Sequence, residues 1–309
     1  MFCFNSSLCY KHFLLETNMD MVDMVKSWPP TLVQYDPVRG PELDYHAVGT
    51  LFLVCMVFWT LTYRVCKGVF MTQDFSGYSP GNQQKLKVLG PGYIYSTINA
   101  GICLYYGFAV FTGYLAEEKL CQTANVGCSS SDIVNSSFIG GVFLMTYLTH
   151  DVFVCWFYPV ELGQNGWDVF IHHFVFIFCT IAGTRAMAMP FAYSWLSLCE
   201  ISTIPLNIRW MTIVYEKGDS ALYHIMSYAF VLCFFAFRVT LYTFGLWDIV
   251  TQMDSIVASF NTFDTVRRWC SFFVLFLVTA GWLLQLYWFF FGILPMLFRK
   301  GKKKSEKSD

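Results

Sequence analysis

Three stretches of the sequence place ionisable side chains among apolar residues, at spacings that bring them to one face of a helix. Asp168 and His172 are four residues apart, so helical geometry stacks them, whereas His173 points about 100° away. A carboxylate that binds one nitrogen of a histidine ring raises the basicity of the other nitrogen. This stretch therefore predicts a proton-transfer unit in which His172 is a base or a nucleophile.

Two further stretches carry polar residues at the same helical spacing. They contain Tyr147, His150 and Asp151 in one case, and Ser197, Glu200, Thr203 and Asn207 in the other. Ionisable groups inside a membrane cost about 2.5–3.5 kcal/mol each on insertion scales, so they usually face a cavity or a partner. We expect the three stretches to meet around one cavity, with His172, Asp151 and Glu200 as candidate catalytic groups. The remaining residues, together with Asp168 and His173, would line that cavity.

Two simpler interpretations stay open for these residues. Polar side chains between membrane helices often hold the helices together, through hydrogen bonds worth about 1 kcal/mol or less. The two histidines could also reach the lipid headgroups. Hydrogen bonding between helices does not require three ionisable groups, which favours the cavity. Arg238 is interpreted as a residue that holds helices together or as a counter-charge.

A metal centre is the rival chemistry for a histidine pair. Membrane di-iron hydroxylases and desaturases need many histidines, arranged in HxxxH and HxxHH boxes. This chain has 6 histidines and neither box. We therefore expect no metal site and no resident cofactor.

The composition indicates that these stretches lie in membrane helices. Of the 309 residues, 56% are hydrophobic and 13% charged, against about 45–50% and 25% in ordinary globular domains. A hydrocarbon core of about 30 Å needs roughly 20 apolar residues in a helix. Segments that pass this test run over residues 47–65, 93–114, 137–158, 169–187, 191–214, 221–244 and 271–298. The expected fold is an all-α bundle of about seven membrane spans that encloses a polar cavity in its cytosolic half.

Basic residues, which prefer the cytosolic side of short loops, indicate the orientation of the bundle. The tail after residue 298 is rich in lysine and arginine, so we place the C-terminus in the cytosol and, with seven spans, the N-terminus in the lumen. We expect a poorly ordered lumenal segment at 1–42, a transmembrane domain at 43–298 and a basic cytosolic tail at 299–309. The formal net charge of −1 gives no indication of a nucleic-acid partner.

The loop between the second and third spans falls on the lumenal side in this arrangement. It holds Cys121, Cys128 and a sequon that begins at Asn135. An oxidising and glycosylating compartment suits these residues, so a Cys121–Cys128 disulfide and glycosylation of Asn135 are candidates. Two free thiols are the alternative to the disulfide.

Three segments resemble the TLC domain, a membrane region that ceramide synthases share with translocating-chain-associated proteins. They read THDVFVCWF at 149–157, DVFIHHFVFIFCT at 168–180 and CEISTIPLNIRWM at 199–211. The resemblance extends over about residues 43–298. At Glu200 the chain departs from the aspartates of the ceramide synthases and is closer to the small TLC-domain-containing proteins.

The resemblance implies a membrane protein of the endoplasmic reticulum that acts on lipids. The favoured interpretation is a role in membrane lipid homeostasis, in which the cavity holds a lipid or an acyl chain. The alternative is an acyl-CoA-dependent N-acyltransferase of the ceramide-synthase type, with His172 oriented by Asp151 or Asp168 and Glu200 across the cavity. A cargo receptor or translocon accessory factor is the third interpretation. The expected partners are membrane lipids or acyl chains, with a homodimer as a further possibility.

Overall fold

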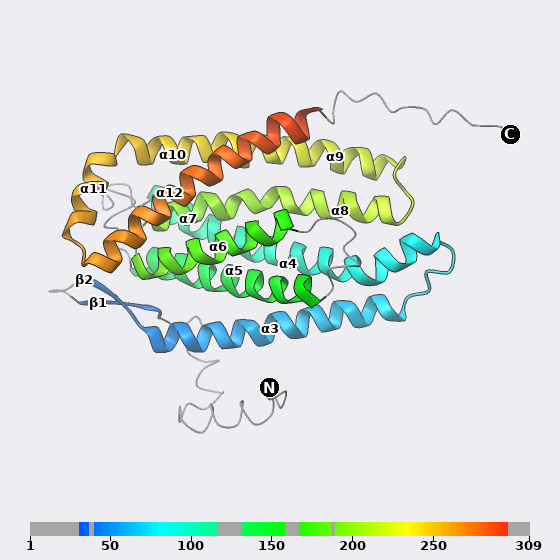
Figure 1. Cartoon of the computed structure of the whole chain (residues 1–309), viewed down its shortest axis with the longest axis horizontal. Coiled ribbons are helices and arrows are strands. Elements are labelled where there is room, and N and C mark those ends of the chain that lie inside the picture. The colour runs from blue at the N-terminus through cyan, green and yellow to red at the C-terminus, as the bar shows by residue number, and fades with distance from the viewer. Residues whose placement is uncertain (1–30, 37–39, 117–130, 158–166, 187–188, 296–309) are drawn as a thin grey trace, which may run out of the picture.

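The computed structural model is a bundle of long helices that lie side by side along its long axis (Figure 1). It describes residues 31–36, 40–116, 131–157, 167–186 and 189–295. The helices are α3 (Tyr45–Thr72), α4 (Pro80–Ala116), α5 (Ser131–Phe157), α6 (Trp167–Ala186), α7 (Pro190–Leu198), α8 (Thr203–Val214), α9 (Ala221–Cys233), α10 (Tyr242–Thr251), α11 (Met253–Thr262) and α12 (Thr265–Tyr287). Three irregular helical segments continue or join them, namely η1 (Cys199–Ser202), η2 (Phe234–Leu241) and η3 (Trp288–Ile293).

Seven helical runs in the described part of the chain correspond to the seven expected spans. They are α3, α4, α5, α6, the run α7–η1–α8, the run α9–η2–α10 and the run α12–η3. Five of the runs are long and apolar enough to cross a membrane, and α6 contributes a shorter apolar helix. The run α7–η1–α8 belongs to neither group, and it is the run that Glu200, Asn207 and Arg209 interrupt. The prediction of an all-α bundle of about seven spans is thus confirmed.

A small antiparallel hairpin precedes the first long helix and lies in the segment that we expected to be poorly ordered. It pairs β1 (Val33–Asp36) with β2 (Gly40–Leu43). Leu32 and Leu43 are buried against side chains of α3 and α5. The Leu32 amide also donates a hydrogen bond of 2.6 Å to Oδ1 of Asn135 in α5. Two leucines and one side-chain hydrogen bond thus anchor the hairpin. These contacts are too few to produce a periodic pattern from which the hairpin could be predicted.

Six of the helical runs close a ring, and α3 packs against its outside. α4 contacts α5, α5 contacts α6, and α6 contacts α12. α12 contacts α10 and η2, η2 contacts η1, and α7 and α8 return to α4. α3 contacts α4 and α5, and the indole nitrogen of Trp59 donates a hydrogen bond of 3.2 Å to the carbonyl of Phe143 in α5. The ring leaves the inner faces of its helices available to enclose a cavity.

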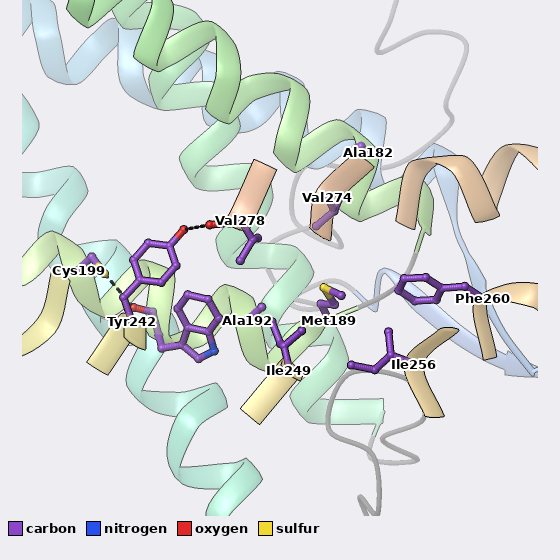
Figure 2. Close-up of a cluster of buried hydrophobic side chains, with 11 residues drawn as sticks. Ala182, Met189, Ala192, Cys199, Tyr242, Ile249, Ile256, Phe260, Val274 and Val278 are labelled. Carbon is purple, nitrogen blue, oxygen red and sulfur yellow. Dashed lines mark hydrogen bonds between the residues drawn. The ribbon is translucent and has the colours of Figure 1, made fainter. Parts of the chain in front are cut away.

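The largest hydrophobic cluster fills the space between α7, α10, α11 and α12 (Figure 2). The rings of Trp195 and Tyr242 pack with their centroids 4.7 Å apart, and the Tyr242 hydroxyl donates a hydrogen bond of 2.7 Å to the carbonyl of Val278. Gly245 permits this packing, because a Cβ atom there would lie 2.6 Å from the indole nitrogen of Trp195. One face of α7 is therefore tightly packed.

Candidate functional site

A cavity of about 120 Å³ lies inside the ring, between α5, α6, α7 and α12. Most of its wall is apolar, whereas we expected a polar cavity. The polar side chains in the wall are those of Ser137, His172, Thr180, Thr184, Tyr193, Ser197 and Glu200. For scale, a cavity of about 150 Å³ in another protein holds a benzene ring. The volume thus suits a small headgroup or a portion of one acyl chain.

The cavity extends from His172 toward the end of the bundle where α6 meets α7. On α6 its lining continues from His172 to Thr184, and on α5 it continues from Leu148 to Val134. In the orientation that the sequence predicts, these residues reach the lumenal end of the bundle. The cavity is therefore not confined to the half that we expected to be cytosolic.

His172 and Glu200 both line this cavity. The His172 ring packs against Phe176 at 4.6 Å and Trp288 at 5.7 Å, measured between ring centroids. Among the described side chains, no carboxylate lies within ion-pair distance of His172. Asp168 is in α6, but its side chain is outside the described set, so its pairing with His172 stays a prediction.

Asp151 is paired with the second histidine instead of the first. Its Oδ2 atom lies 3.2 Å from Nδ1 of His173, at an orientation that does not form a hydrogen bond. Consecutive side chains on a helix point about 100° apart, and the one that meets Asp151 is His173. The expectation that Asp151 orients His172 is thus wrong, and neither Asp151 nor His173 is part of the cavity wall.

Tyr147 and His150, which we expected in the cavity wall, lie in an aromatic cluster outside it. The Tyr95 hydroxyl and Nδ1 of His150 are 2.9 Å apart, and the Tyr95 ring packs against Tyr147 and Trp59 at 4.8 and 5.1 Å. This cluster joins α3, α4 and α5. At this level, the face of α5 that lines the cavity carries Leu144 and Leu148, so Tyr147 and His150 lie on a different face.

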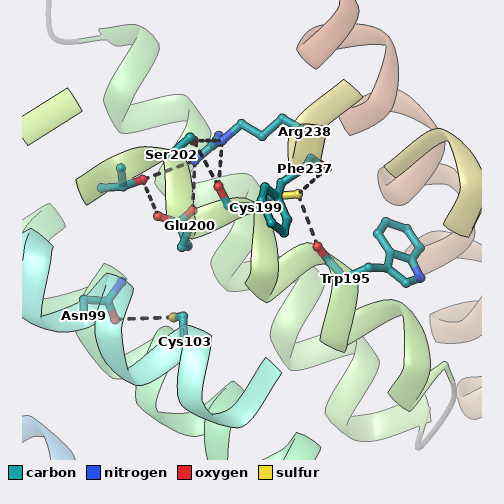
Figure 3. A network of polar contacts seen from close by, with 9 residues as sticks. Asn99, Cys103, Trp195, Cys199, Glu200, Ser202, Phe237 and Arg238 are labelled. Carbon is teal, nitrogen blue, oxygen red and sulfur yellow. Dashed lines mark hydrogen bonds and ion pairs between the residues drawn. The ribbon is translucent and has the colours of Figure 1, made fainter. Parts of the chain in front are cut away.

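Arg238 in η2 neutralises Glu200 and holds its carboxylate in place (Figure 3). Nη2 of Arg238 lies 3.2 Å from Oε1 of Glu200, and the hydroxyl of Thr203 donates a hydrogen bond of 2.7 Å to Oε2. Nε of Arg238 donates to Oγ of Ser202 at 2.8 Å and to the carbonyl of Cys199 at 3.1 Å. Both carboxylate oxygens therefore have a partner, and Arg238 acts as the counter-charge.

Two irregular helix segments bring this network together. Pro205 has no N–H to donate to the carbonyl of Ile201, and the residues just before α8 form the tighter 3₁₀ segment η1. Opposite it, η2 is a π-helix, a rare form that is frequent at functional sites. Both segments depart from regular α-helix near Glu200, where the side chain of Arg238 reaches Cys199, Glu200 and Ser202 of η1.

The remaining residues of the Glu200 stretch have different roles. Ser197 lines the cavity, whereas Thr203 belongs to the Arg238 network. The Asn207 amide donates to the carbonyl of Tyr93 at 3.2 Å and to the hydroxyl of Thr97 at 3.1 Å, so it ties α8 to α4. Thr203 and Asn207 are therefore not in the cavity wall, contrary to our expectation.

Tyr193 is a cavity residue that the sequence reasoning missed. It lies four residues before Ser197 and seven before Glu200, so the same helical spacing continued one turn toward the N-terminus would have included it. Its ring stands over α5, since a Cβ atom on Gly141 would be 4.0 Å from Cε2 of Tyr193. The wall formed by α7 and η1 therefore carries three polar groups in sequence.

The structure does not support either of the predicted lumenal modifications. Cys121 and Cys128 lie outside the described residues, so the disulfide stays a prediction. Asn135 is half-buried in the first turns of α5, because this helix begins at Ser131 rather than after the sequon. Its Oδ1 atom accepts the hydrogen bond from Leu32, whereas a glycosylation acceptor belongs to a surface loop.

A family model described as the TLC domain matches residues 93–293, from within α4 to the end of η3. These residues form most of the ring and all of the cavity wall, while α3 and the hairpin lie outside the match. No curated protein matches the chain.

Proposed function

Since the chain belongs to the TLC-domain family, we propose that this multi-pass membrane protein binds a lipid or an acyl chain in the cavity of its ring. The observation that supports this proposal is a mostly apolar cavity with polar groups along one wall, inside the membrane-spanning bundle. A lipid is the ligand that reaches such a cavity at high local concentration. We further propose that the protein acts in the lipid homeostasis of the endoplasmic reticulum membrane, with its N-terminus in the lumen and its C-terminus in the cytosol.

The apolar part of the wall can contact an acyl chain but gives no preference for one acyl chain over the surrounding lipid tails. Surrounding lipid tails are as apolar as the side chains of Leu144, Phe176 and Val278, so transfer of a chain into the cavity has no hydrophobic driving force of its own. Selection of the ligand therefore depends on packing and on the polar groups. The positions of His172, Ser197 and Glu200 in the wall support binding of an amphiphile in a fixed orientation.

Mass spectrometry of lipids that co-purify with the protein tests the proposal. Gly183→Leu and Gly141→Leu fill the cavity, because both glycines line it and a Cβ atom at either has ordinary contact distances of 3.6–4.0 Å. We expect both variants to lose the bound lipid. Gly101→Leu on α4 is the matched control, since a Cβ atom there meets nothing within 4 Å.

The lipid that co-purifies with wild type should be retained by the control variant. Equal lipid content in wild type, Gly183→Leu and Gly141→Leu would contradict the proposal. The alanine variants of the two cavity glycines should fold and keep most of the lipid, which separates loss of the cavity from loss of the helix glycine.

The acyltransferase alternative has one observation in its favour, namely that the His172 side chain lines the cavity. An acyltransferase would consume long-chain acyl-CoA when offered a sphingoid base, and His172→Ala would stop the reaction without loss of folded protein. Turnover that is absent in wild type, or unchanged in His172→Ala, would contradict catalysis by this residue. No described contact favours the cargo-receptor interpretation.

A further inference from the structure

Arg209 on α8 carries a positive charge that no carboxylate neutralises among the described side chains. The ion pairs in that part of the chain join Asp151, Glu200 and Asp264 to other basic residues. Arg209 lies five residues before the end of α8, about 7.5 Å along the helix axis. Ionisable residues in membrane spans are rare, and they usually pair with one another or mark a binding path. Arg209 is therefore free to pair with an anion from outside the protein.

The Arg209 side chain is held in position by α9. Its Nε atom donates a hydrogen bond of 3.1 Å to Oγ of Ser227, and Nη2 donates one of 3.3 Å to the hydroxyl of Tyr223. Its Cζ atom lies 5.3 and 5.6 Å from the ring centroids of Tyr223 and Trp210. A guanidinium group has five N–H donors, and these two hydrogen bonds use two of them. Three donors thus remain on a group that is already oriented.

The unused nitrogen of Arg209 is accessible. Nη1 has no hydrogen bond to a described residue and is not among the buried unpaired atoms, and the residue as a whole is only partly buried. Arg209 also does not line the cavity of the ring. The free donors therefore face the outside of the bundle.

The surface around Arg209 resembles a membrane–water interface. Trp210 is 38% exposed and Tyr228 of α9 is 62% exposed, and such amphipathic rings are enriched at the level of the lipid headgroups. Leu222 and Ile225 of α9 are exposed as well, and they can contact acyl chains. The anion that reaches Arg209 most readily is thus part of a lipid headgroup.

This end of the bundle has an excess of positive charge. The α8–α9 junction lies at the same end as the α3–α4 junction, to which Glu216 is hydrogen-bonded (Figure 1). The two junctions and the adjoining turns carry the basic residues Arg64, Lys67, Lys85, Lys87, Arg209 and Lys217 and the acidic residues Asp74, Glu216 and Asp219. In the orientation that we propose, this end faces the cytosol, and the cytosolic leaflet contains anionic lipids.

We infer that Arg209 and the hydroxyl of Tyr223 bind the phosphate group of an anionic phospholipid in the leaflet at this end of the bundle. Guanidinium groups bind phosphate through two parallel N–H donors. The Tyr223 hydroxyl accepts a hydrogen bond from Arg209 and can donate its own hydrogen to a phosphate oxygen, while Ser227 positions the guanidinium. This site goes beyond the proposed function, because it lies outside the cavity.

Native mass spectrometry of the whole purified chain in detergent tests the inference. It measures the binding of three lipids with the same dioleoyl chains: phosphatidylglycerol, which is anionic, phosphatidylcholine, which is zwitterionic, and diacylglycerol, which has no phosphate. We expect phosphatidylglycerol to bind at least about 10-fold more tightly than the other two, a factor that corresponds to about 1.4 kcal/mol. Arg209→Met should remove this preference.

Arg185→Met is the matched control, because Arg185 is 40% exposed at the opposite end of the bundle and pairs with Asp264 at 3.7 Å. This variant should keep the preference for phosphatidylglycerol. Equal affinity of wild type for phosphatidylglycerol and phosphatidylcholine, or an unchanged preference in folded Arg209→Met, would overturn the inference. Inorganic phosphate in large excess should leave the lipid bound, and displacement of the lipid would overturn its assignment as the ligand.

A second measurement uses wild type alone and does not depend on the folding of an Arg209 variant. Phosphatidylglycerol with a photoreactive headgroup should crosslink to α8 and to the first turns of α9, and crosslinks confined to other helices would overturn the inference. Gly183→Leu fills the cavity and should keep both the crosslink and the lipid preference. Their loss in this variant would assign the anionic lipid to the cavity, so failure of this site and failure of the proposed function are distinguishable.

Discussion

The two faces of the run α7–η1 differ in how closely they are packed. On one face, the Trp195 ring packs against Tyr242, and the polar groups of η1 are bound by Arg238 (Figures 2 and 3). On the other face, Tyr193 and Ser197 line the cavity. The difference indicates that the Arg238 network stabilises the fold, whereas the proposed ligand would bind on the cavity face.

Among the variants predicted for the two faces, removal of the Arg238 side chain should have the largest effect on the free energy of unfolding. In Arg238→Met the Glu200 carboxylate loses its counter-charge, and breaking a buried ion pair in this way costs about 3–5 kcal/mol. Thermal unfolding in detergent would show the loss, and Glu200→Gln in the same chain should recover part of it. Arg209→Met is the control, because Arg209 donates to Ser227 and Tyr223 and not to a carboxylate. Equal destabilisation by the two methionine variants would remove the distinction.

Alanine at a glycine of each face tests the difference in packing. Gly245→Ala places a methyl group against the Trp195 ring, and overpacking of this kind costs about 1–3 kcal/mol. Gly183→Ala meets Val274 at 3.9 Å, an ordinary contact distance, so we expect unchanged or slightly higher stability. Midpoints of thermal unfolding for the two variants measure the difference. If Gly183→Ala lowered the unfolding midpoint more than Gly245→Ala, the cavity side would be packed as tightly as the other side.

A second contact between a carboxylate and a basic side chain shows whether such a contact alone determines stability. Asp151 and His173 are 3.2 Å apart without an aligned hydrogen bond, so we expect Asp151→Asn to cost about 1 kcal/mol or less. The same thermal assay detects this as a small shift beside that of Arg238→Met. A loss as large as that of Arg238→Met would show that the two pairs contribute equally.

The smallest effect concerns a contact outside the membrane spans. Hydrogen bonds from Ser79, and then from Asn82, lower the pKa of Glu216 below its usual value of 4.5. A carboxyl group with a lowered pKa stabilises the folded state above its usual pKa, and this contribution is lost as the pH falls through the folded value. The protection factor of the Ser79 amide, which is the intrinsic exchange rate at each pH divided by the measured rate, should therefore be lower at pH 3.5 than at pH 6, and Glu216→Gln should remove this difference.

Asp254→Asn, which removes another exposed carboxylate, is the control for this loop contact. It should keep the pH dependence of exchange at Ser79. The prediction is contradicted if Glu216→Gln keeps the same dependence as wild type, because the titrating group would then be a different one.

The number of membrane-length helical runs and the polar stretch of α7–η1 could be predicted from sequence, because each depends on local spacing. Runs of about 20 apolar residues are a strong signal, and Ser197 and Glu200 are three residues apart, so helical spacing brings them to one face. The same spacing would have revealed Tyr193. Local periodicity identifies which residues share a face of one helix, and this is where the sequence reasoning succeeded.

Partners from other helices could not be predicted, because spacing within one helix does not define how it is rotated against its neighbours. The pairing of Asp151 with His173 depends on the rotation of α5 against α6. The reach of Arg238 to Glu200 spans 38 residues and depends on the π-helix η2, whose register differs from that of an α-helix. For the same reason Tyr147 and His150 of α5 were assigned to the cavity, although they contact Tyr95 of α4.

The hydrogen bond between Trp59 and Phe143 has a consequence for how the protein is made. Its two residues are 84 positions apart, so the acceptor on α5 is synthesised long after α3. At a translation rate of about 5–20 residues per second, roughly 4 to 17 seconds separate them. During that time the indole N–H of Trp59 lies in the newly inserted helix without its final hydrogen-bond acceptor. Any factor that binds this face of α3 during synthesis would act in this interval.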